Sequence, residues 1–112
     1  SGYSIYYSSV SSNAISTDYT RDPVTEVLDS HMEILDDIHF MVRVVLDEQG
    51  KEIISDCLIY TVNDLKVKEI LYDDLSGMEY KDMKLDREQR KVYITYLDGD
   101  KEKIKEYEMI VK

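Results

Sequence analysis

The residues best suited to chemistry in this chain are two histidines and a single cysteine. His31 and Glu33 have the His-x-Glu spacing of zinc deaminases, but the Pro-Cys-x-x-Cys segment that completes such a site is missing. His31, His39 and Asp36 could share a metal ion, although three ligands without supporting partners make a weak site. Cys57 could pair with a histidine as a nucleophile, yet nothing recognisable supplies an oxyanion hole. We therefore expect no catalytic site, no metal and no cofactor.

Other chemical motifs are also incomplete. The glycines cannot cradle a phosphate, because they lie far apart, at positions 2, 50, 77 and 99. Residues 98–102 resemble the start of a calcium loop, but Lys103 stands where the loop needs glycine and Met109 where it needs a bidentate Glu. The acidic pairs at 36–37 and 73–74 could serve acid–base chemistry only in a cleft that raises one pKa. An enzyme is the least favoured function.

The composition excludes several classes of protein. A chain of 112 residues with 43% hydrophobic content forms one domain with its own core. Its 24 acidic and 14 basic residues give a net charge of −10, which argues against direct binding to DNA or RNA phosphates. No run of residues approaches the roughly 18 apolar residues of a membrane span. The single cysteine excludes an intramolecular disulfide and slightly favours a reducing compartment such as the cytoplasm.

The first element that would position these residues is a predicted helix over 22–38. Asp22 suits the N-cap and Pro23 the first helical position. At 100° per residue, one side of the helix carries Val24, Val27, Leu28, His31, Ile34, Leu35 and Ile38. The other side carries six acidic residues: Asp22, Glu26, Asp29, Glu33, Asp36 and Asp37. The pattern predicts an amphipathic helix with an acidic face.

From residue 39 onward the apolar period changes from 3.6 to 2. Residues 39–46 and 53–62 predict a hairpin around a turn at 47–50. Both faces of this strand pair are largely apolar, as in strands covered on both sides. Residues 63–77 fit either a short helix or a strand, because a stretch of this length is not settled by its period.

The C-terminal third predicts a β meander with strands near 79–85, 91–97 and 101–112. Asp98-Gly99 is a two-residue hairpin signal between the last two. The expected fold class is therefore α+β: a small antiparallel sheet, made of the hairpin and the meander, with one acidic amphipathic helix packed on it. A second short helix is added if 63–77 is helical.

Residues 1–20 differ from the rest of the chain. They contain seven Ser, four of the ten Tyr and one charged residue, Asp18. Weak alternation over about 3–10 allows an edge strand, and the Tyr/Ser/Asn composition resembles that of adaptable binding loops. We therefore divide the chain into a Tyr/Ser-rich arm or edge strand, 1–20, and a single α+β domain, 21–112.

The negative charge is concentrated in one region. Residues 79–112 hold nine acidic and nine basic residues, and residues 1–21 hold one of each, so the whole excess lies in 22–78. On the predicted helix the carboxylates would occur about every 4 Å, close to the roughly 3.4 Å spacing of phosphates along one DNA strand. Like charges four residues apart would each destabilise that helix by about 0.2–0.5 kcal/mol.

These observations predict a non-enzymatic acidic protein-interaction module. The acidic helix face would mimic nucleic-acid phosphates and block the basic surface of a nucleic-acid-binding protein, as small phage inhibitors do as a class. The six acidic residues of the helix would then be the partner-binding residues. A simpler hypothesis is that this face is only solvated. The alternative function is a soluble accessory domain, extracytoplasmic or derived from a lipoprotein, that uses the 1–20 arm for self-association or partner contact.

Overall fold

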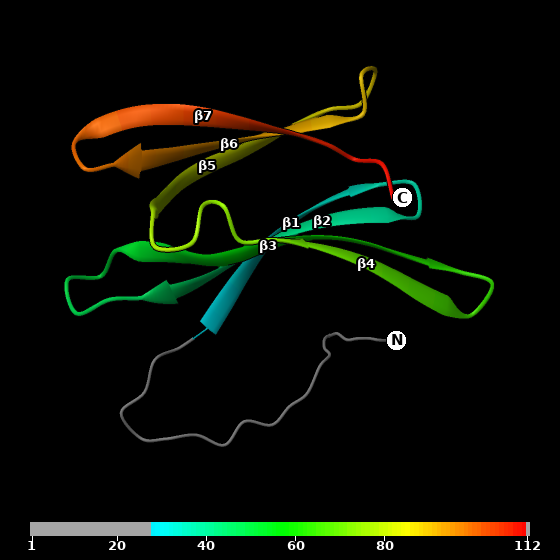
Figure 1. Cartoon of the computed structure of the whole chain (residues 1–112), viewed down its shortest axis with the longest axis horizontal. Helices are drawn as coiled ribbons and strands as arrows, with labels where there is room; N and C mark the ends of the chain where they lie inside the picture. The colour runs from blue at the N-terminus through cyan, green and yellow to red at the C-terminus, as the bar shows by residue number, and fades with distance from the viewer. Residues whose placement is uncertain (1–27, 112) are drawn as a thin grey trace.

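The computed structural model describes residues 28–111, which form seven β-strands (Figure 1). The strands are β1 (Leu28–Leu35), β2 (Ile38–Leu46), β3 (Glu52–Asn63), β4 (Lys66–Tyr72), β5 (Glu79–Asp86), β6 (Lys91–Asp98) and β7 (Lys101–Glu108). All paired strands are antiparallel. Within this range no helix has the length and apolar character needed to span a membrane.

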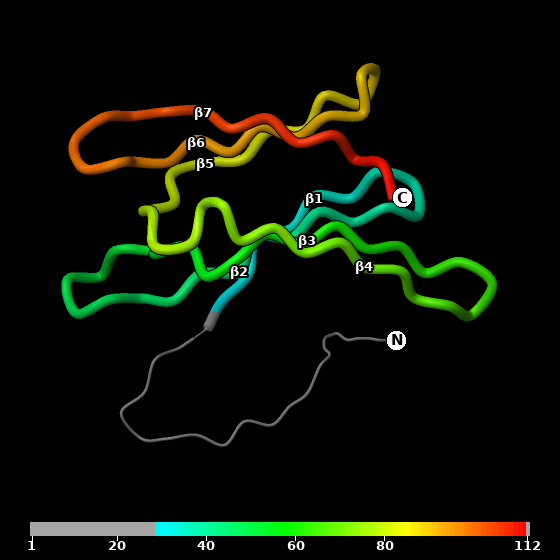
Figure 2. The backbone as a smooth tube through the Cα atoms, viewed as in Figure 1, coloured from blue at the N-terminus to red at the C-terminus, as the bar shows by residue number. Residues whose placement is uncertain are grey.

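Strand β3 is the branching point of the sheet. The strand order is β1-β2-β3-β5-β6-β7, and β4 pairs with β3 outside that path. Near its start β3 pairs with β5 through Ile53 and Glu79, whereas from Cys57 to Asn63 it pairs with β4. The sheet therefore folds over on itself: β5–β7 lie as one layer above β1–β4 in the backbone trace (Figure 2).

The hydrophobic core lies between these two layers. Alternate residues of β2 point inward, as the period of two requires: Phe40, Val42 and Val44. Their buried partners come from β3, β6, β7 and the residue that follows β7: Ile54, Cys57, Ile59, Val92, Ile94, Tyr107 and Met109. The ring of Tyr107 lies 5.1 Å from that of Phe40, and its hydroxyl donates a 2.7 Å hydrogen bond to Asp74. The core thus spans both layers.

The predicted helix over 22–38 is wrong for the residues that the structure describes, and the fold class is all-β rather than α+β. Residues 28–35 form β1, which pairs with β2 from Leu28↔Val45 to Leu35↔Ile38. Asp36 and Asp37 form the two-residue turn, with Asp36 at φ 54°, a conformation that Asp tolerates better than most residues.

The physical reason is that the apolar residues of 28–38 fit both periods. As a strand, this segment buries Leu35 and hydrogen-bonds to β2. As a helix, it would place Glu33 four residues from both Asp29 and Asp37 and pair like charges. Residues 22–27 and the 1–20 arm lie outside the described residues.

The other predicted strands are confirmed with small changes in their bounds. The hairpin at 39–62 is β2 and β3, and the meander is β5, β6 and β7. The turn between β6 and β7 is centred on Gly99 and Asp100 rather than on Asp98-Gly99, and Gly99 has φ 67°. The segment at 63–77, which fitted either element, contains strand β4.

Replacing Leu65 with Gly is expected to raise the free energy of unfolding by about 1 kcal/mol. Leu65 is the second residue of the β3–β4 turn, has φ 63° and is 99% exposed, so its side chain packs on nothing described while its backbone is strained. Urea unfolding measures the change. The control is Leu46→Gly, at an exposed strand end, which is expected to destabilise the protein because glycine weakens a strand. Equal destabilisation by both would contradict this turn geometry.

Candidate interaction surface

The outer face of β1–β4, on the side away from the core, is apolar. Met41 of β2 lies between Met32 of β1 and Leu58 of β3, and Leu58 pairs in turn with Leu71 of β4. Directly opposed residues share a face, so these four side chains form one row across four strands. Adjacent rows on the same face add Ile34, Tyr60, Val62 and Val67. We call these eight residues the interaction face.

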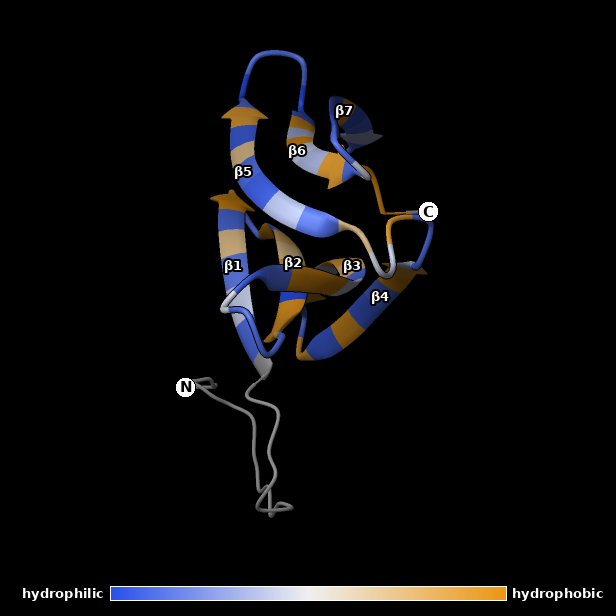
Figure 3. Cartoon of the chain, turned by 90° about the vertical axis from the view of Figure 1, so that its left-hand side faces the viewer, coloured by the Kyte–Doolittle hydropathy of each residue, from blue (hydrophilic) through white to orange (hydrophobic). Residues whose placement is uncertain are grey.

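Much of the interaction face is open to solvent. The exposed fraction is 58% for Leu71 and Val67, 51% for Val62, 47% for Ile34 and 40% for Met32. The alternation of apolar residues on both sides of β2 and β3 predicted cover on both faces. Within residues 28–111, only the inner face is covered, by β5–β7. Figure 3 shows this arrangement from the side, with hydrophobic residues along β1–β4.

One polar contact borders the interaction face and another lies within it. Arg43 donates hydrogen bonds of 2.7 and 2.6 Å to the two carboxylate oxygens of Asp56, and these bonds raise the pKa of the guanidinium. His39 stacks on Tyr60 with ring centroids 4.9 Å apart. Burial lowers the pKa of His39 against the opposing effect of Asp37, so the imidazole is neutral at pH 7. A fixed ion pair therefore borders the apolar rows on one side, and an uncharged ring stack lies between them.

The structure separates the four described residues among the six acidic residues predicted to bind a partner. Asp29 and Glu33 lie on the inner side of β1, opposite the interaction face. The acidic pair 36–37 forms the β1–β2 turn, and Asp22 and Glu26 lie outside the described residues. The helical spacing that suggested phosphate mimicry is therefore absent from the described residues, while the partner-binding role of these acids stays a prediction.

The two histidines and the cysteine do not converge. His31 points inward, where its Nε2 lies 2.8 Å from Glu52 Oε1 and its ring stacks on Tyr80 of β5 at 4.4 Å. His39 lies on the opposite, outer face. Cys57 is buried in the core, and burial raises the pKa of its thiol to about 12, so it is not an activated nucleophile. Among residues 28–111, no three His, Cys, Asp or Glu side chains are placed to hold a metal.

His31 therefore has a structural role, since its stacking on Tyr80 connects β1 to β5 where the two layers meet. Burial, helped by Asp82, Glu52 and Glu33, raises the pKa of Tyr80 to about 12 and keeps the stacked phenol neutral. Sequence reasoning did not single out the interaction face. The signal was present in the second apolar face of β2 and β3, which predicted strands covered on both sides.

Comparison of the chain with family models, curated proteins and solved structures found no match. Function is therefore inferred from the fold and its surfaces alone.

Proposed function

We propose that the protein is a non-enzymatic interaction domain that binds a basic protein partner through the interaction face. The observation that carries this proposal is the solvent exposure of five apolar residues on one face of β1–β4: Met32, Ile34, Val62, Val67 and Leu71. Single exposed apolar residues are ordinary, but a contiguous apolar surface rimmed by polar groups is typical of a binding site.

The interaction face has dimensions that suit a folded partner. Four strands about 4.8 Å apart span roughly 15 Å, which accommodates a helix of roughly 10 Å diameter or a pair of opposing strands. The face is formed by paired strands, and the Arg43–Asp56 ion pair holds one border in place. Because the surface is already formed, little ordering entropy is lost when a partner binds.

The acidic surroundings of the face favour a basic partner. Glu69 lies on the same face, opposite Tyr60, and Asp36 and Asp37 lie at the end of the β1–β2 hairpin. The whole chain carries a net charge of −10. Complementary charge at the rim speeds association and disfavours acidic partners, a second copy of this chain included. Asp36 and Asp37 thereby keep a place in partner binding, beside an apolar centre.

Site-specific photocrosslinking tests the proposal. A photoreactive amino acid at position 71 is expected to form an adduct with a partner in an extract of the cells that make the protein, because Leu71 is an exposed residue in a row of the face. The matched control is position 104 on β7, where Ile104 is 66% exposed outside the face. Val67→Lys, added to the position-71 protein, is expected to reduce the adduct about tenfold by placing a charge in the apolar contact.

Three results would contradict the proposal. The first is that position 104 gives the same adduct as position 71, and the second is that Val67→Lys leaves the adduct unchanged. The third is an adduct with twice the mass of the chain. The last result would identify a second copy rather than a basic partner as the occupant.

A further inference from the structure

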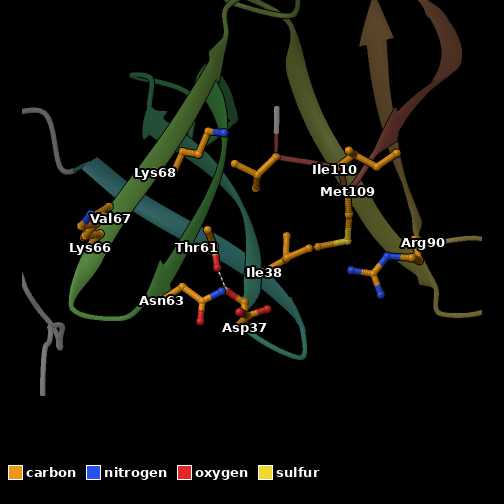
Figure 4. A pocket seen from close by; sticks show the side chains of 11 residues that line it. Asp37, Ile38, Thr61, Asn63, Lys66, Val67, Lys68, Arg90, Met109 and Ile110 are labelled. Atoms are coloured by element: carbon orange, nitrogen blue, oxygen red, sulfur yellow. Dashed lines mark hydrogen bonds between the residues drawn. The ribbon is translucent and has the colours of Figure 1, made fainter.

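A groove on the inner side of β4 has a different character from the interaction face. Its volume is about 660 Å³, and it lies between the β3–β4 hairpin, the β1–β2 and β5–β6 turns and residues 109–111 (Figure 4). We propose that this groove binds a small anionic amphipathic molecule, namely a carboxylate on an aliphatic chain. Val67 and Asp37 border this groove as well as the interaction face, but the lysines lie on the inner side of β4, and the inference does not depend on the function proposed for the outer face.

The centre of the groove is aliphatic. Ile38 and Met109 lie at its centre (Figure 4). Ile110 and Val111 also line it and add further apolar surface. The backbone N–H of Met109 donates a 2.8 Å hydrogen bond to the carbonyl of Arg90, which holds the segment after β7 against the β5–β6 turn. The floor is therefore preformed and suited to an apolar chain.

Cationic groups stand on two sides of this floor. Lys66 and Lys68 are two residues apart on β4 and oppose Asn63 and Thr61 of β3, so both lie on the inner side. Arg90 stands across the groove. The lining thus holds three cationic side chains and one carboxylate, that of Asp37, in a chain whose net charge is −10. This local excess is opposite in sign to the charge of the protein.

The two lysines are available to an anion. Arg90 pairs with Asp36 at 3.6 Å, but Lys66 and Lys68 form no ion pair with any of residues 28–111. The hydroxyl of Thr61 donates to the carbonyl of Asp37 at 2.6 Å, which closes the lower wall. A carboxylate near the lysines would receive charge-assisted hydrogen bonds, which are the stronger kind.

The turns around the groove carry backbone strain. The non-glycine residues with positive φ in the described chain are Asp36, Asp64, Leu65 and Arg90, and all of them lie in the three turns that border the groove. Positive φ is usual in tight hairpin turns, so these residues fix the shape of the turns at the border of the groove.

The lining also selects among anionic ligands. The volume falls within the roughly 300–1,000 Å³ of small-molecule sites. No aromatic side chain among the described residues lines the groove, so nothing there would stack on a nucleobase. The aliphatic floor between cations instead matches an aliphatic chain with an acidic head.

Calorimetric titration with decanoate, below its micelle concentration, tests the proposal on the intact chain. Saturable binding is expected, and Lys66→Glu with Lys68→Glu is expected to weaken it about tenfold or more, because two cationic donors become repulsive carboxylates. The matched control is Lys101→Glu with Lys103→Glu, which makes the same charge change at the same spacing on exposed β7. This control is expected to change the affinity less than twofold.

Methionine methyl signals locate the ligand. On addition of decanoate the signal of Met109, at the floor of the groove, is expected to shift, whereas those of Met32 and Met41 on the interaction face are not. The proposal is overturned by the absence of saturable heat, by equal loss of affinity in both double variants, or by shifts of Met32 and Met41 in place of Met109. Equal binding of the neutral amphiphile decyl maltoside would likewise overturn the requirement for an anion.

Discussion

Substitution of Phe40 by Ala is expected to lower the free energy of unfolding by about 3–5 kcal/mol. Phe40 is fully buried, pairs with Ile59 across β2 and β3, and packs its ring against Tyr107 of the other layer at 5.1 Å. Removing the ring loses its transfer free energy and leaves a cavity between two layers that meet at this point. A domain of this size has a total stability of about 5–15 kcal/mol, so the loss is a large part of it.

Urea unfolding followed by circular dichroism measures the effect of Phe40→Ala. The control is Ile104→Ala on β7, where the side chain is 66% exposed and a change within about 0.5 kcal/mol is expected. A loss below about 1 kcal/mol for Phe40→Ala would mean that the layer β5–β7 does not close over β2. It would therefore contradict the two-layer fold itself.

Raising the pH above 9 is expected to destabilise the protein strongly. Burial raises the pKa of the Cys57 thiol from 9.0 to about 12 and that of Tyr80 from 10.0 to about 12, and it also raises the pKa of Tyr107. The folded protein thus favours the neutral forms of these groups. Their stabilising contribution is complete below pH 9 and is lost as the pH rises from 9 towards 12.

The size of the alkaline effect follows from the shift at Cys57. At pH 10.5 this group alone is expected to remove about 2 kcal/mol, because each pH unit between the unfolded and folded pKa costs about 1.4 kcal/mol. Urea unfolding at pH 8 and at pH 10.5 measures the difference in stability. In Cys57→Ala that difference is expected to shrink by about the same amount, whatever the substitution itself costs. Equal stability of the unaltered protein at the two pH values would contradict the burial of these groups.

Much of the strand content could be predicted from local patterns. The turn at 47–50, the turn residues at 86–89 and the glycine at position 99 separate runs of alternating residues, and β2, β3, β5, β6 and β7 lie close to where these signals predict. These elements are hairpin neighbours, with the exception of β3 and β5, so their pairing partners are close in sequence. Local information was sufficient for them.

Strand β1 could not be assigned in this way. Its apolar residues fit a helical period as well as an extended one, and the Asp36-Asp37 pair was interpreted as the end of an acidic helix rather than as a turn. What decides between the two is the edge of β2, which offers eight residues of backbone pairing to β1. That edge lies outside the segment itself, so no local propensity of residues 28–35 reports it.

The two candidate surfaces also differ in how far local patterns could predict them. The pattern of residues 39–62 indicated the second apolar face, although it predicted that both faces would be covered. The groove was not foreseen, because its cations come from β4 and from the β5–β6 turn, more than twenty residues apart in the sequence. Its walls meet only because β3 pairs with both β4 and β5 and thereby turns one layer over the other.

The sequence by itself determined the charge, the hairpins and the apolar alternation on both sides of the central strands, since composition, turn residues and side-chain period are local properties. Only the tertiary structure decided that residues 28–35 are a strand, that the outer face of β1–β4 is left open by the described residues, and that Lys66, Lys68 and Arg90 border one groove. Those outcomes depend on strand pairing and layer packing between distant residues, whose free energies exceed the small local preferences that a single segment expresses.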